Sequence, residues 1–435
     1  MKNALHFCFC FYLGLSFLKA DILPIQSFKT PLGLETWLVE DHTSPVVSLV
    51  FNFDKAKLGS PFKPSTTLFN RIILDGAGVL SPLEMDRFTK GTPAMATLQT
   101  TIAKTTLTLK TTKNGLASTL KLWSQLISNP RLQNANLAHG KAQALSAISH
   151  SNEDLELSAF LNLLQTIFPK SSFKPDFEKA PEIINSLTAS DLEKETTDQF
   201  LSSRPKVVVV GDVSKRELTE ILDATFGALP LQSPAKPVKS LEPRWNRKDV
   251  FIEKNLSQSV VVFGQPGVDP LSKEYSKYLL LEYVLYGRLF DELREKRGLV
   301  YSIQFSETHI KDIDLLIGNF SCECTNAPQV AKFIKSEWER LKDFGITQKE
   351  LSHAQLSFKR NKILSLTSTT SVAKEYANPL AFNLTPEAAR THLINADKVT
   401  LKEMNKFIQD VLKPETLTFV LIGPHSSPSN LKGKK

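Results

Sequence analysis

The chain has 435 residues, of which 41% are hydrophobic and 23% are charged. This composition is typical of a globular protein and excludes a wholly disordered chain, and the length is sufficient for two domains. The formal net charge is +8, but acidic residues are interleaved with the basic ones, and the one basic run is the short KGKK tail. We therefore interpret the charge as solvated surface and expect no nucleic-acid partner.

The first segment, residues 1–20, has the pattern of a secretory signal peptide. Lys2 precedes a mostly apolar stretch, and Ala20 ends the segment before Asp21. The stretch is short for a membrane span. Leu18 lies where a small residue is preferred before a cleavage site, so an uncleaved anchor remains the alternative. We expect an exported protein, periplasmic if the source is bacterial, with no stable membrane insertion after cleavage.

The rest of the chain contains one pattern of strand and turn residues twice. A strand end, a polar turn and a β-branched strand are predicted in both VEDHTSPVVSLVFNF and IEKNLSQSVVVFGQ. A strand that ends at a glycine is predicted later in each copy, in KVVVVGD and in TFVLIGP. Val39 and Gly211 are 172 positions apart, and Ile252 and Gly423 are 171 positions apart. This matched spacing predicts a tandem duplication of one α/β unit.

The predicted boundary lies in a proline-rich stretch. Residues 230–245 contain four prolines and read as an extended linker between an N-terminal domain (21–229) and a C-terminal domain (246–435). The alternation of threonine and apolar residues at 96–112 predicts a hairpin, and LVYSIQFSE with DLLIGNFSCE predicts a second. Hairpins followed by long helices predict an α+β fold in which each domain packs a largely antiparallel sheet with helices.

Two segments resemble a known family, the insulinase/pitrilysin metallopeptidases, which includes the mitochondrial processing peptidase. LFDELREKRGLVYS (289–302) is similar to the family's C-terminal Arg/Tyr motif, and VVVVGDVSKRELTEILDATFGALP (207–230) is similar to the end of its first domain. The likeness extends from about residue 24 to 425. It implies two tandem homologous domains, hinged to form a clam-like chamber that encloses a peptide.

Active members of that family carry H-x-x-E-H on an early helix, in which two histidines one turn apart bind Zn²⁺ and the glutamate activates its water. In the matching helix STTLFNRIILDGAG the three positions are Thr67, Asn70 and Arg71. Threonine is a poor zinc ligand, asparagine cannot accept a proton, and arginine brings a permanent cation. The family's more distant glutamate is absent from AQALSAISH (142–150) as well. We therefore expect no metal and no cofactor in this chain, and no peptidase activity from it alone.

The Arg/Tyr motif, in contrast, is present as Arg297 and Tyr301. The resemblance implies that these side chains reach toward the zinc of an active site and stabilise the scissile carbonyl, which suits a guanidinium and a phenol. The alternative interpretation is a helix-end cation and a strand aromatic. The family's usual Gly/Ser-rich loop before RLF is missing here. Residues Ala94, Met95, Ala96 and Thr97 match the family strand that pairs with substrate.

Loss of the zinc positions together with retention of Arg/Tyr resembles the non-catalytic partner in a two-subunit bacterial protease. We expect a heterodimer with a zinc-bearing H-x-x-E-H paralogue, in which zinc and the general base lie on that partner, Arg297 and Tyr301 act in trans, and peptides are the substrates. The alternative is a pseudo-protease that binds peptides or serves as a scaffold in a larger complex.

Overall fold

The computed structural model describes residues 24–73, 93–132, 134–171, 173–232, 241–245 and 248–424, together with Leu83 and Gly91. The predicted signal peptide and the centre of the predicted linker lie outside the described residues. Among the residues that are described, no helix is both long enough and apolar enough to cross a bilayer.

The first half of the chain builds a six-stranded sheet in the order β1-β2-β6-β3-β5-β4. Its strands are β1 (Gln26–Lys29), β2 (Glu35–Glu40), β3 (Val46–Asp54), β4 (Met95–Thr100), β5 (Lys104–Thr112) and β6 (Lys206–Gly211). Every neighbouring pair is antiparallel except β2 with β6. The four valines of β6 are all buried, as expected for a central strand covered on both faces.

The second half repeats this sheet with five strands, in the order β7-β11-β8-β10-β9. They are β7 (Val250–Glu253), β8 (Gln258–Pro266), β9 (Ser302–Ile310), β10 (Ile313–Glu323) and β11 (Thr418–Gly423). The single parallel pair, β7 with β11, stands where β2 pairs with β6 in the first sheet. The order therefore matches β2-β6-β3-β5-β4 strand for strand, which confirms the predicted duplication and both predicted hairpins.

The glycine that closes each repeat has a steric role. A Cβ added to Gly211 would lie 2.0 Å from the carbonyl oxygen of Val46, and one added to Gly423 would lie 2.2 Å from the Ser259 hydroxyl oxygen. Gly211 also has a φ of +138°, which L residues rarely adopt. In both sheets the last strand thus approaches its neighbour more closely than a side chain would permit.

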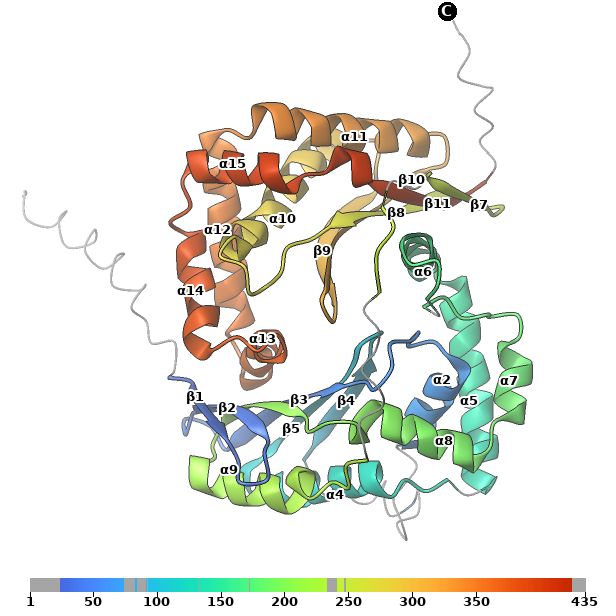
Figure 1. Cartoon of the computed structure of the whole chain (residues 1–435), viewed down its shortest axis with the longest axis vertical. Coiled ribbons are helices and arrows are strands. Elements are labelled where there is room, and N and C mark those ends of the chain that lie inside the picture. The colour runs from blue at the N-terminus through green and yellow to red at the C-terminus, as the bar shows by residue number, and fades with distance from the viewer. Residues whose placement is uncertain are drawn as a thin grey trace, which may run out of the picture.

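Helices cover the outer face of each sheet (Figure 1). Those of the first half are α2 (Pro64–Ile72), α4 (Leu116–Ser128), α5 (Asn134–Glu153), α7 (Ala180–Ser186), α8 (Ala189–Thr196) and α9 (Lys215–Leu222). Those of the second half are α10 (Tyr275–Leu289), α11 (Ala327–Phe344), α12 (Gln348–Ser365), α14 (Pro386–Ala396) and α15 (Leu401–Val411). Reciprocal capping boxes begin α12 and α15 at Thr347 and Thr400.

Two further helices are exchanged between the halves. Helix α6 (Leu155–Ile167) belongs to the first half but packs on the second sheet, where Leu163 and Leu164 join a buried cluster with strands β8, β10 and β11. Helix α13 (Thr369–Ala381) belongs to the second half but packs on the first sheet, where Tyr376 and Leu380 meet buried valines of β3 and β6. Figure 1 shows each helix lying against the other half's sheet. This reciprocal packing holds the two lobes face to face in the clam-like arrangement.

Polar contacts fix the register of α13 on the first sheet. The Ser48 hydroxyl lies 2.8 Å from the hydroxyls of both Thr369 and Thr370. The Asn52 amide donates to the carbonyl oxygen of Ala377 at 2.8 Å. Because Asn52 is almost fully buried, this bond satisfies an amide that would otherwise be costly in the core.

Truncating the exchanged helix should destabilise the whole chain. Leu163 is fully buried, and its Cδ2 would lie 3.2 Å from a Cβ on Gly264, so Leu163→Ala leaves a cavity between the halves. We expect a loss of about 2–5 kcal/mol in the free energy of unfolding, measured by urea denaturation. Leu356→Ala, at a leucine that is 46% exposed, is the control and should change it by less than about 0.5 kcal/mol. Equal, small effects of both substitutions would contradict the packing described for α6.

Candidate functional site

Helix α2 forms where the sequence analysis places the degenerate zinc helix. Its buried residues Leu68, Phe69 and Ile72 face the core of the first half. A Cβ on Gly140 of α5 would lie 2.4 Å from Ile72, so the two helices touch at that glycine. The apolar side of the helix is therefore intact, although its three motif positions have changed.

The three motif positions lie on the polar side of α2. Thr67 and Asn70 are half-buried and Arg71 is exposed. The Asn70 amide nitrogen donates to the Thr100 hydroxyl at 3.1 Å. Thr100 in turn donates to the side-chain carbonyl of Gln199 at 3.2 Å, and Thr105 donates to the same oxygen at 3.0 Å. Asn70 thus belongs to a hydrogen-bonded network of neutral side chains.

This network ends at Glu195, which is 3% exposed. Its carboxylate accepts hydrogen bonds from the hydroxyls of Ser65 (2.8 Å) and Thr66 (2.6 Å) in the first turn of α2, and from the Gln199 amide (3.2 Å). Lys63 lies 3.4 Å away. Burial alone would raise the pKa of Glu195, but the positive charge of Lys63 and the hydroxyl donors together lower it below its ordinary value. We call these residues around Glu195 the α2 network.

Sequence reasoning missed Glu195 and Gln199. The family's distant glutamate was expected within residues 142–150, whereas the carboxylate that contacts α2 comes from α8. The i, i+4 spacing of Glu195 and Gln199 places both on one face of a helix, and that is the one signal in the sequence that could have identified them.

The residues of α2 do not fit zinc. The donors present are a threonine hydroxyl and an asparagine amide already donating to Thr100, with the cation of Arg71 beside them. Within the described parts of the chain, no group of three or more His, Cys, Asp or Glu side chains could hold a metal ion.

Strand β4 lies at the open edge of the first sheet. Met95, Ala96 and Thr97 are all exposed, Met95 to 71%, and Ala94 is half-buried just before the strand. Among the residues that the structure describes, the strand pairs with β5 and with no other strand. With respect to those residues, its other side can hydrogen-bond with an added strand.

Arg297 follows helix α10 and its π-helical extension (Phe290–Glu295). Its guanidinium lies over the ring of Phe333 in α11, 4.6 Å from the ring centroid, and one nitrogen is 3.7 Å from a carboxylate oxygen of Glu292. The side chain is 46% exposed. Gly298 then turns the chain with φ of +62°. Among the described residues, nothing lies within 4 Å of a Cβ added there, so this turn needs glycine for its backbone angle and not for space.

Tyr301 lies just before β9 and is 48% exposed. Its backbone N–H donates to the carbonyl oxygen of Ser321 at 2.8 Å, which ties it to the sheet. In the part of the chain that the structure describes, its hydroxyl has no hydrogen-bond partner, and no bond, ion pair or ring contact joins Arg297 or Tyr301 to α2. The two groups of predicted site residues lie in different lobes (Figure 1).

The lobes share a cavity of about 320 Å³ at the ends of their edge strands. It is lined by the β4–β5 turn, by α6, by the end of β9 and by α13. Lys104 of the first half crosses it to donate to the Asn378 side chain at 2.7 Å, and His309 packs against Phe382 with ring centroids 4.5 Å apart. The end of β4 and the end of β9 thus meet at one cavity between the halves.

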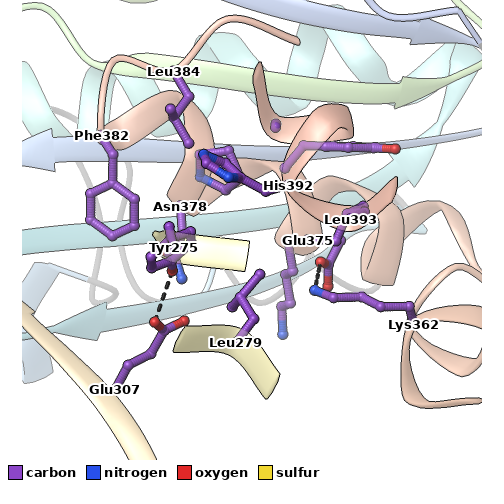
Figure 2. A pocket seen from close by; sticks show the side chains of 14 residues that line it. Tyr275, Leu279, Glu307, Lys362, Glu375, Asn378, Phe382, Leu384, His392 and Leu393 are labelled. Carbon is purple, nitrogen blue, oxygen red and sulfur yellow. Dashed lines mark hydrogen bonds and ion pairs between the residues drawn. The ribbon is translucent and has the colours of Figure 1, made fainter. Parts of the chain in front are cut away.

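A second cavity, of about 240 Å³, lies inside the second half between α10, α13 and α14 (Figure 2). The Tyr275 hydroxyl donates to the Glu307 carboxylate at 2.8 Å, and Lys362 forms an ion pair with Glu375. Burial raises the pKa of Tyr275, with Glu307 contributing. Because Glu307 is bound by Tyr275 and Lys362 is paired with Glu375, we interpret the cavity as part of the packing that supports β9.

Comparison with known proteins identifies what the chain is similar to. Residues 186–358 match the family described as peptidase M16 inactive domain. The non-peptidase homologue YmxG of Helicobacter pylori is 23% identical over 94% of this chain and 96% of its own length. The mitochondrial-processing peptidase subunit beta of Blastocladiella emersonii is 23% identical over 71% of this chain and 69% of its own length. The crystal structure of a peptidase M16 inactive domain from Pseudomonas fluorescens superposes with a TM-score of 0.81, at 19% identity, over 93% of this chain and 99% of that one.

The α2 network predicts a pH-dependent contribution to stability. Glu195→Gln removes the charge that two buried hydroxyls and Lys63 recognise, so we expect a loss of about 1–3 kcal/mol near neutral pH, measured by urea denaturation. Because the folded pKa of Glu195 is lowered, this contribution is present above its unfolded pKa of about 4.3 and disappears as pH falls through the folded value.

The matched control is Glu193→Gln, at an exposed glutamate on the same helix, which should change stability by less than about 0.5 kcal/mol. A difference between wild type and Glu195→Gln that stays constant down to pH 2 would contradict the proposed role of the carboxylate charge.

Proposed function

We propose that this chain is an inactive, non-peptidase member of the peptidase M16 (insulinase) family, which the match over residues 186–358 and the full-length relative support, and that it is the non-catalytic, substrate-binding subunit of a two-subunit zinc peptidase. In this proposal the partner is a paralogous chain that carries H-x-x-E-H, and zinc and the general base lie on that partner. The reaction of the assembled pair is hydrolysis of a peptide bond.

The observation that carries the proposal is the contrast between the two motifs. On α2 the apolar side is kept for packing while Asn70 is bound into the α2 network and no metal-binding donor set remains. Tyr301, in contrast, is half-exposed at the start of an edge strand. The Tyr301 side chain is therefore accessible to a ligand, whereas the Asn70 amide is already hydrogen-bonded within the α2 network.

Peptide binding is supported by the open edge of β4. Ala94, Met95, Ala96 and Thr97 offer main-chain groups to an extended substrate, and their small or flexible side chains leave that edge accessible. Strand addition takes most of its affinity from main-chain hydrogen bonds. We therefore expect a loose dependence on peptide sequence at this strand.

The proposed contribution of Arg297 and Tyr301 is electrostatic. A phenol or guanidinium positioned against a carbonyl oxygen stabilises the negative charge that develops there during hydrolysis. To reach a peptide, Arg297 must leave the ring of Phe333. A partly exposed cation–π contact is worth about 0.5–1 kcal/mol, so this movement has a small cost.

A paired arrangement is supported by the relative from Blastocladiella emersonii, which is itself named as one subunit of a peptidase. We propose an exported, periplasmic location on the pattern of residues 1–20. A second function, a peptide-binding scaffold with no part in catalysis, is favoured by one observation, the stacking of Arg297 on Phe333. Copurification of an H-x-x-E-H paralogue from the native cell distinguishes the two.

Substitutions in the motif test the proposal in the reconstituted pair. Tyr301→Phe removes only the phenolic hydroxyl, so we expect intact folding and assembly with a turnover lowered roughly ten- to a thousand-fold, up to the effect of one oxyanion donor. Arg297→Ala should weaken both substrate binding and turnover, because an extended guanidinium can hold a peptide carbonyl before and during attack. Steady-state kinetics measure both, with assembly checked by size-exclusion chromatography.

Lys296→Ala is the control for charge, since Lys296 is an adjacent exposed cation that pairs with Asp291 and Glu292. It should leave kcat and KM unchanged. If the Arg297→Ala/Tyr301→Phe double variant kept wild-type turnover, the two side chains would have no part in catalysis, and the scaffold function would be favoured.

A further inference from the structure

The backbone that carries Arg297 is fixed by hydrogen bonds on its C-terminal side. The Gly298 N–H donates to the carbonyl oxygen of Arg294 at 3.1 Å, and the Leu299 N–H donates to that of Leu293 at 2.7 Å. These two bonds close the end of the helical segment around the turn. The Cα position of Arg297 is therefore set by the fold, and the place that its guanidinium reaches is decided by side-chain rotamers.

Two side chains hold the guanidinium in the position that the structure shows. The ring of Phe333 lies against one face of it, with the guanidinium carbon 4.6 Å from the ring centroid. The Glu292 carboxylate lies 3.7 Å from one of its nitrogens. Phe333 is half-buried and packs against the core of the second half, and Glu292 is also paired with Lys296 at 2.7 Å. Both groups therefore have other contacts that keep them in place when Arg297 moves.

The position is directed away from the edge of the second sheet. Phe333 belongs to α11, one of the helices that cover the outer face of that sheet (Figure 1), whereas Tyr301 lies just before the edge strand β9. Among the described residues, the guanidinium has a ring contact with Phe333 and an ion pair with Glu292, and neither kind of contact joins it to Tyr301. The two side chains of the motif are thus not assembled as a pair in this arrangement.

We propose that Phe333 and Glu292 are positioning residues that form a resting site for Arg297, from which its guanidinium moves when a bound peptide offers a carbonyl oxygen. This inference rests on the proposed function and concerns the regulation of the same site. Both contacts are weak enough to be exchanged, because a half-exposed cation–π contact and a half-exposed ion pair each contribute little in water. The exchange needs rotation of one side chain and no movement of the backbone.

The resting site has a kinetic signature. When one of two conformations binds a ligand, the apparent Kd is the intrinsic Kd divided by the fraction of the protein in that conformation. Removing the Phe333 ring raises the fraction of chains in which Arg297 is available, and leaves unchanged the contacts that Arg297 then makes. We therefore expect a lower KM at constant kcat. A merely structural role of Phe333 would give the opposite result, a loss of turnover or of stability.

The first measurement follows the guanidinium in the purified chain. Phenylglyoxal reacts with accessible guanidinium groups, and the rate at Arg297 is read by mass spectrometry of its peptide. We expect Phe333→Leu to raise this rate about two- to five-fold. Phe333→Tyr keeps a ring face and should retain the wild-type rate. Phe344→Leu, at a phenylalanine of the same helix that is 80% exposed, is the matched control and should retain it as well. Equal rates in the wild type and in Phe333→Leu overturn this inference.

The second measurement is the steady-state kinetics of the reconstituted pair. Phe333→Leu should lower KM about two- to five-fold and leave kcat within about two-fold. In the Arg297→Ala background the same substitution should leave KM unchanged, because the side chain through which it acts is gone. Glu292→Gln should also lower KM, which keeps the test decisive if Phe333→Leu folds poorly.

The outcomes separate this inference from the proposed function. A KM that neither substitution lowers, or that Phe333→Leu lowers equally in the Arg297→Ala background, overturns the resting site and leaves the proposed function standing. Absence of hydrolysis by the pair of wild-type chains overturns both.

Discussion

The exchange of α6 and α13 between the halves is the constraint on which the rest of the structure depends. Each sheet has one face covered by its own helices and the other covered by a helix of the opposite repeat. Neither half could bury its second face alone, because the valines of β3 and β6, and the corresponding residues of β8 and β11, would be exposed to water. The two lobes are therefore one folding unit, and the positions of β4, β9 and the segment that carries Arg297 and Tyr301 follow from it.

The position of α2 does not depend on Thr67, Asn70 and Arg71, the residues at the three zinc-motif positions. Its packing depends on Leu68, Phe69 and Ile72 against the core and on the close approach of α5 at Gly140. The opposite side of the helix depends on the Glu195 carboxylate, which binds the hydroxyls of the first turn. The motif positions and the packing residues lie on different sides of α2. The residues at the motif positions can therefore be substituted while the packing of the helix stays the same.

Much of this fold was predictable from local patterns. The strand alternation at 96–112, the equal spacing that ends at Gly211 and Gly423, and the capping boxes at Thr347 and Thr400 all act over short distances or by repetition. The exchange of α6 and α13 could not be predicted from the sequence, because an apolar helix face predicts that the helix is buried but not which sheet covers it. Likewise, nothing near Arg297 in sequence indicates that its guanidinium would lie on Phe333, a contact made only when α11 folds back.

We propose that this chain completes the active site of a zinc-bearing paralogue. The most direct measurement is the peptidase activity of that paralogue, at fixed concentration, as this chain is added in increasing amounts. We expect little hydrolysis by either chain alone, and a peptidase activity that rises as this chain is added and reaches a plateau when the two chains are equimolar. A paralogue that is fully active alone and unaffected by the addition would contradict it.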